Sequence, residues 1–126
     1  DRGLFPAPRD GFVGRWTREG GRTGWCLVED GDIRGYGVIR PCRQGHKIGP
    51  LFAEDPRDAD LIFRALASTV KGQEIVLDPP EPNEEAIALA ERHDLSPVFE
   101  TARMYRGPDP GLPLDRIYGI TTFELG

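Results

Sequence analysis

The stretch that decides the fold is EIVLDPPEPNEEAIALAERHDL, residues 74–95. Its apolar start predicts a short strand over Glu74–Asp78, and the prolines that follow give a rigid exit from that strand. Asn83 then serves as a helix N-cap, and two glutamates in the first helical turn favour the positive end of the helix dipole. This order of strand, cap and amphipathic helix indicates a crossover unit packed on a β-sheet.

The preceding segment predicts another strand and another helix. Asp55 is a good N-cap, Pro56 stands at the first helical position and Gly72 ends the helix. The helix has an apolar stripe made of Ala59, Ile62, Phe63, Leu66, Ala67 and Val70. The strand covers Lys47–Ala53, and Pro50 lacks a backbone donor, so we expect this strand to lie at an edge or to splay there.

A hairpin is predicted at Thr23–Arg40, because Asp30-Gly31 separates two apolar runs. Glu29 then faces Asp32, and Cys26 falls opposite Gly35 while Cys42 lies beyond its reach. We therefore expect two free thiols in a reducing compartment. Gly35 and Gly37 share one strand face. Their missing side chains leave either a flat floor, where a ring or another backbone can approach, or a bend in the strand.

Two more strands, Pro97–Tyr105 and Arg116–Leu125, complete the pattern. Hairpins at both ends and crossover helices between them predict an α/β (α+β) fold with a mixed, mainly antiparallel sheet and two long helices packed on it. Residues 1–22 are rich in Gly, Arg and Pro and are interpreted as a linker or arm from a missing upstream domain. The domain itself is assigned to residues 23–126.

The bulk properties exclude some classes of function. The chain has 126 residues, enough for one domain, and its net charge of −5 argues against a nucleic-acid groove. No apolar run approaches the roughly 18 residues that a membrane helix needs. Basic residues concentrate before residue 48 and acidic residues after it, which indicates either solvated faces or a basic surface for an anionic ligand or an acidic neighbouring domain.

The chain resembles the GNAT N-acetyltransferase superfamily over residues 23–125. The resemblance is clearest in residues 74–95, and it extends to RPCRQGHKIGPLFA at 40–53, FETARMY at 99–105 and GITTFELG at 119–126. These segments resemble the C-terminal module of bacterial proteins that carry two GNAT-like halves in tandem. The resemblance implies a GNAT-like sheet, acetyl-CoA as cofactor of the parent protein, and an N-terminal GNAT domain of the same chain as partner.

One departure from the family concerns the cofactor. In the family, a glycine-rich loop and a helix N-terminus hold the CoA pyrophosphate, whereas residues 53–60 read AEDPRDAD, with four carboxylates and no glycine. We therefore expect this fragment to bind no CoA in the usual way. If CoA does bind here, the resemblance implies contacts from Leu51, Phe52, Ala53 and Asn83. The tyrosine that the family often places on the second helix as an acid is replaced by Leu89 or a neighbour.

Candidate acceptor-site residues lie on several predicted strands. Arg40, Arg43 and Lys47 form a cationic run that suits a carboxylate or phosphate, or else a solvated loop. The other candidates are Tyr36, Arg103 and Thr122 for binding and Glu124 as general base, and Arg103 and Glu124 could equally form a structural ion pair. We place any ligand in a crevice between the strands Leu51–Ala53 and Glu74–Asp78.

We interpret the chain as an accessory or acceptor-substrate lobe of a cytoplasmic acetyl-CoA-dependent N-acetyltransferase, not catalytic alone. The alternatives are a complete acyl-CoA N-acyltransferase with an altered CoA site, and a non-enzymatic small-molecule binding module. The expected partners are a small-molecule or amine acceptor and, in one alternative, a second copy. No nucleic-acid or membrane partner is expected. No metal site is expected either, because neither histidine has ligands at metal spacing. His93 is expected to be solvated at a helix end.

Overall fold

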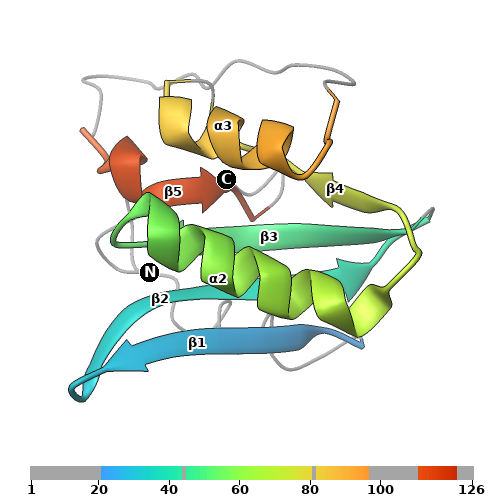
Figure 1. Ribbon diagram of the computed structural model, residues 1–126, viewed down its shortest axis with the longest axis horizontal. Helices are drawn as coiled ribbons and strands as arrows, with labels where there is room; N and C mark the ends of the chain where they lie inside the picture. Colours follow the sequence, from blue (N-terminus) through green and yellow to red (C-terminus); the bar gives the residue numbers. More distant parts are fainter. Residues whose placement is uncertain (1–20, 44, 81, 97–110, 122–126) are drawn as a thin grey trace.

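The computed structural model describes residues 21–43, 45–80, 82–96 and 111–121. The strands are β1 (Thr23–Glu29), β2 (Asp32–Pro41), β3 (His46–Ala53), β4 (Ile75–Leu77) and β5 (Ile117–Gly119). The helices are α2 (Pro56–Ala67) and α3 (Glu84–Arg92), with short 3-10 turns η1 (Ser68–Val70) and η2 (Leu114–Arg116). The predicted mixed sheet with two helices is confirmed (Figure 1). The predicted strand at residues 97–105 and nearly all of the predicted arm lie outside the described residues.

The sheet runs in the order β1-β2-β3-β4, and β5 also pairs with β3. The β3–β4 pair is parallel and the other pairs are antiparallel. Thus β3 is a central strand, and its expected place at an edge is wrong. The expected splay is present, because residues 46–48 pair with β4 whereas Leu51 and Phe52 pair with β5. Pro50 lies where β3 changes from pairing with β4 to pairing with β5, so its missing backbone N–H does not break a continuous row of hydrogen bonds between two strands.

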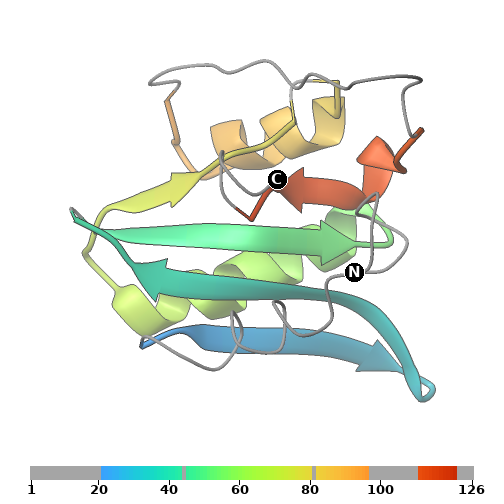
Figure 2. The same ribbon diagram turned by 180° about the vertical axis from the view of Figure 1, so that it is seen from behind.

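Helix α2 covers one face of β1, β2 and β3, lying in front of them in Figure 1 and behind them in Figure 2. Its buried stripe includes Ile62 and Leu66, which pack over the two glycines of β2. A Cβ on Gly35 would lie 2.9 Å from Ile62 Cδ1, and a Cβ on Gly37 would lie 2.9 Å from Leu66 Cδ1. The side of Gly35 and Gly37 that faces α2 is therefore covered by the protein's own helix.

Helix α3 lies beside α2 on the same side, where the rings of Phe63 and His93 stack with centroids 4.3 Å apart. Both helices start as predicted: the Asp55 side chain accepts from Asp58 N, and the Asn83 side chain accepts from Ala86 N. No helix in the described part of the chain is long and apolar enough to cross a membrane.

The hairpin turn forms as predicted, with Asp30 at φ 51° and Gly31 at φ 82°, and Glu29 faces Asp32. A β-bulge then shifts the register between Leu27 and Val28, so Cys26 faces Tyr36 and not Gly35. The predicted register was wrong by one residue because strict alternation does not allow for the extra residue in β2. Cys26 and Cys42 are nevertheless both free thiols, as expected, and the reducing compartment stays a prediction.

Candidate functional site

The crevice predicted between β3 and β4 is filled by the chain itself. Strand β5 runs antiparallel to the end of β3, with Leu51 opposite Gly119. Gly119 is wedged between the two strands, because a Cβ there would lie 2.7 Å from Leu77 Cδ1 on β4 and 3.3 Å from Leu51 Cβ on β3. Its neighbours Ile117 and Tyr118 are buried. The prediction of an open ligand crevice at this place is therefore wrong.

Asn83 fixes the inserted strand to the start of α3. Its Nδ2 donates to Leu114 O at 2.9 Å and to Ile117 O at 3.0 Å, and its Oδ1 accepts from Ala86 N at 3.1 Å. The residue is 5% exposed. Both amide protons, which the resemblance directed to a cofactor, are used on the backbone of η2 and β5. The backbone N–H of Ile120 also donates to Asp78 O at 3.0 Å, which closes the far end of the insertion.

The N-terminus of α2, where the family binds the CoA pyrophosphate, is occupied by carboxylates. Asp55 Oδ1 accepts from Asp58 N at 2.9 Å and so caps the helix. The guanidinium of Arg34 bridges both acids, with Nη2 at 3.0 Å from Asp55 Oδ2 and at 2.8 Å from Asp58 Oδ2. Its Nε also donates to Asp58 Oδ2 at 3.0 Å. The helix donors thus meet an internal ion network in the position that an anionic ligand would take.

Arg34 is the member of this network that sequence reasoning missed. It stands next to Gly35, where the β1–β2 register shifts, and this irregularity in the alternation lets its side chain reach the start of α2. The hydrogen bond to Asp58 raises the pKa of Arg34 above its ordinary value, and the charges of Asp58, Asp55 and Glu29 act in the same direction. The sequence offered one signal for this network: a basic residue just after the hairpin turn, followed later in the chain by a helix start with two aspartates.

The sheet face opposite α2 carries several predicted binding residues. The ring of Tyr36 meets Phe52 edge-on, with centroids 5.3 Å apart. Arg40 faces Lys47 in the β2–β3 register. Lys47 is buried, and its ammonium forms an ion pair with the buried carboxylate of Asp78. The structure thus brings four of these residues onto one sheet face and commits the Lys47 charge to an internal partner.

The remaining predicted residues separate into three groups. Leu51 and Ala53 belong to the buried core. Arg43 follows β2 and is exposed. Arg103, Thr122 and Glu124 lie outside the described residues, so their predicted roles stay predictions.

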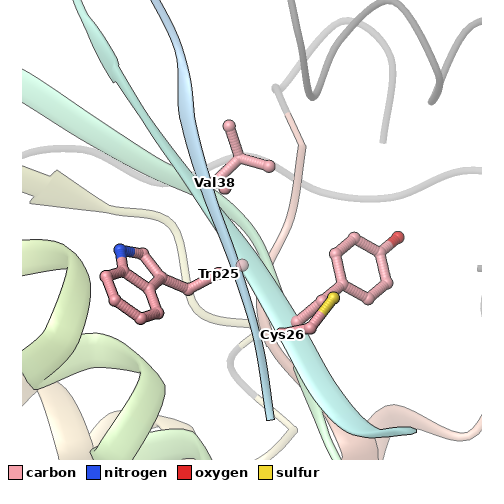
Figure 3. Close-up of a pocket in the computed structure, with 6 residues that line it drawn as sticks. Trp25, Cys26 and Val38 are labelled. Carbon is pink, nitrogen blue, oxygen red and sulfur yellow. The ribbon is translucent and has the colours of Figure 1, made fainter. Parts of the chain in front are cut away.

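A shallow depression of about 280 Å³ lies at the edge of the sheet (Figure 3). Trp25 and Cys26 project to opposite sides of β1, so the depression straddles a strand and does not enter the interior. Its lining holds no charged side chain; the residues are Gly24, Trp25, Cys26, Tyr36, Gly37 and Val38. The only lining side chains that could take part in acid–base or nucleophilic chemistry are the exposed Cys26 thiol and the Tyr36 phenol.

An Asp–His pair joins the two helices. Nε2 of His93 donates to Asp60 Oδ1 at 2.8 Å, and Arg64 Nε lies 2.9 Å from Asp60 Oδ2. Burial opposes ionisation of Asp60, but the hydrogen bond from His93 and the nearby positive charges hold the pKa of Asp60 below its ordinary value. His93 stands at the end of α3 as expected, but its ring packs against α2 and is not fully solvated.

Helix α3 contains no tyrosine that could donate a proton to a leaving group. Leu89, at the position that the family often gives to that tyrosine, is buried. Tyr118 on β5 is buried as well, and burial raises the pKa of Tyr118 to about 12, so its phenol stays protonated. Within the described ranges no three His, Cys, Asp or Glu side chains gather as a metal site.

Comparison with known proteins adds three findings. A family described as "Acetyltransferase (GNAT) domain" matches residues 1–119. The holothin acyltransferase of a Pseudoalteromonas species is 30% identical over 127 aligned positions, which cover 100% of this chain and 43% of that protein. A crystal structure of a protein from Pyrococcus horikoshii, assigned as an acetyltransferase, superimposes with a TM-score of 0.77 at 28% identity, covering 100% of this chain and 41% of that one. The chain thus spans less than half the length of both relatives.

Proposed function

Since this chain belongs to the family of GNAT acetyltransferase domains, we propose that it is the C-terminal lobe of an acetyl-CoA-dependent N-acyltransferase and that this lobe holds no acetyl-CoA itself. The observation that supports the proposal is that protein groups occupy the two places where the resemblance implies cofactor contacts. Strand β5 occupies the crevice, and Arg34 with two aspartates occupies the helix start. The lobe would close the acceptor pocket or hold the two halves of the enzyme together.

Electrostatics at the start of α2 opposes a pyrophosphate. Asp55 and Asp58 carry two negative charges, and Arg34 offsets one of them. At about 4 Å and an effective dielectric constant of about 20, each like-charge contact costs roughly 4 kcal/mol. The free energy that a helix N-terminus offers an anion, up to about 2 kcal/mol, is smaller than this penalty.

Shape opposes the rest of the cofactor. A ligand between β3 and β4 would have to displace β5, which is anchored through Asn83 and Asp78. The two obstacles are independent, because one is a charge at a helix start and the other is a strand in a crevice. Removing either one alone therefore leaves the other in place.

The acceptor side of the proposal uses the face opposite the helices. Tyr36 and Arg40 lie on that face, and Arg43 is an exposed cation just beyond the end of β2. With Arg103, Thr122 and the general-base candidate Glu124, these residues would meet a small-molecule or amine acceptor. The parent enzyme would be cytoplasmic, in keeping with two free thiols, and an N-terminal GNAT domain of the same chain would bind acetyl-CoA.

Calorimetric titration with acetyl-CoA tests the lobe directly. We expect no binding to the 126-residue chain, and no binding to the double variant Asp55→Asn/Asp58→Asn, in which only the charge is removed and Asn still caps the helix. Low-micromolar binding to the wild-type chain would refute the proposal. Binding to the variant alone would show that charge excludes the cofactor and that β5 does not.

Release of free CoA from acetyl-CoA, followed with amine acceptors, addresses the alternative of a complete enzyme. Turnover by the wild-type chain would favour an acyltransferase with an altered cofactor site. If the wild-type chain shows no turnover, while a parent protein with its upstream domain does, the accessory lobe is supported.

A further inference from the structure

The exposed apolar side chains gather at one edge of the molecule. The large ones among the described residues are Trp25, Val28, Ile33 and Leu61, which are 48%, 56%, 64% and 42% exposed. Three belong to the β1–β2 hairpin and the fourth to α2, which packs against that hairpin. Such a gathering at one edge is typical of an interaction surface.

The backbone of β1 makes this edge suited to strand addition. Within the described part of the chain, β1 pairs with β2 on one side and with no strand on the other. Its sequence, TGWCLVE, contains neither Lys nor Pro, which guard edge strands in many proteins. The seven residues are therefore long enough and apolar enough to receive another strand.

We propose that β1 binds β1 of a second copy in antiparallel orientation, which joins the two sheets into one. A full-length pairing about a two-fold axis is centred on Cys26, the middle residue of Thr23–Glu29. Trp25 then lies opposite Leu27 of the other copy, and Val28 lies opposite Gly24. A large side chain faces a small residue in the second pair, so the edge is complementary to itself.

The charges at the two ends of β1 favour the same orientation. Arg22 directly precedes the strand, whereas Glu29 ends it and Asp30 and Asp32 follow in and after the turn. Antiparallel pairing sets the basic end of one copy beside the acidic turn of the other and keeps the two acidic turns apart. Parallel pairing would bring like charges together at both ends. This inference does not depend on the proposed function.

Sedimentation equilibrium of the 126-residue chain measures the association. We expect a concentration-dependent dimer, and we expect Val28→Lys to raise its dissociation constant at least about tenfold, or 1.4 kcal/mol. The matched control is Ile33→Lys. Ile33 is the cross-strand neighbour of Val28 and is somewhat more exposed, but it lies on β2, so we expect little change. A chain that stays monomeric up to about 1 mM, or equal effects of the two variants, would overturn the proposal.

Cross-linking tests the register. With copper–phenanthroline and dissolved oxygen as the oxidant, two Cys26 thiols should lose their protons and electrons and form one disulfide between copies, because paired residues on neighbouring strands have Cβ atoms about 4.5–5.5 Å apart. We expect a covalent dimer that Cys26→Ser abolishes and Cys42→Ser leaves intact. A cross-link that runs through Cys42, or that survives Cys26→Ser, would refute the pairing.

Discussion

Replacement of Asn83 is the sharpest test of how β5 is held in the crevice. The side chain makes one capping bond to Ala86 N and two bonds to the carbonyls of Leu114 and Ile117. Ser keeps an oxygen for the cap but cannot reach the two carbonyls. Leu114 O is half-buried and still accepts from the backbone N–H of Ile117, whereas the loss of the bond to the buried Ile117 O costs about 1–3 kcal/mol. Asn83→Ser should thus lower the free energy of unfolding by about 1–3 kcal/mol. Asn83→Ala also loses the cap, which adds about 1 kcal/mol.

Urea unfolding followed by circular dichroism and tryptophan fluorescence measures both losses. Glu84→Ala serves as the control, because Glu84 is exposed in the same helical turn and its replacement should stay within about 0.5 kcal/mol. Unchanged slopes of unfolding free energy against urea would show that the midpoints report stability. If Asn83→Ser were as stable as the wild type, the carbonyls of β5 would not depend on the amide, and the anchoring role of Asn83 would be refuted.

Two further predictions concern pH and activity. The pKa of Asp60 in the folded state lies below its ordinary value of 3.8, so the ionised carboxylate stabilises the fold above pH 3.8 and this contribution is lost as the pH falls below that value. Asp60→Asn should therefore make the stability depend less steeply on pH in acid, which thermal unfolding at a series of pH values measures. In the parent enzyme, Arg43→Ala and Glu124→Gln should each reduce turnover or acceptor affinity more than tenfold while changing stability by less than about 1 kcal/mol, and full activity in both variants would remove them from the acceptor site.

The helices and the hairpin were predictable because local chemistry decides them. Asp55 and Asn83 are caps that hold their helix starts through bonds within three residues. The Asp30-Gly31 turn requires positive φ at both positions, and this sequence allows it. Each of these signals is local and does not depend on the rest of the fold.

The bulge and the role of Arg34 could not be predicted in the same way. Strict alternation places every residue of β2 by counting from the turn, and the count fails once an extra residue is accommodated. What favours the extra residue is distant: the guanidinium reaches Asp58, 24 positions along the chain. Likewise, the sequence showed that a strand follows residue 116, but not that this strand enters the gap between β3 and β4. Its partners Leu51 and Leu77 lie far upstream.

The Asp55 cap and strand β5 stabilise two different parts of the fold. A helix start exposed after loss of its anion would leave backbone donors without partners, and the Asp55 cap satisfies one of them. A crevice left empty between β3 and β4 would expose Leu51 and Leu77, and β5 covers both. Protein groups thus supply the capping and the apolar contact that a bound cofactor would otherwise provide. The fold can therefore be stable without a ligand at either place, as the proposal of an accessory lobe requires.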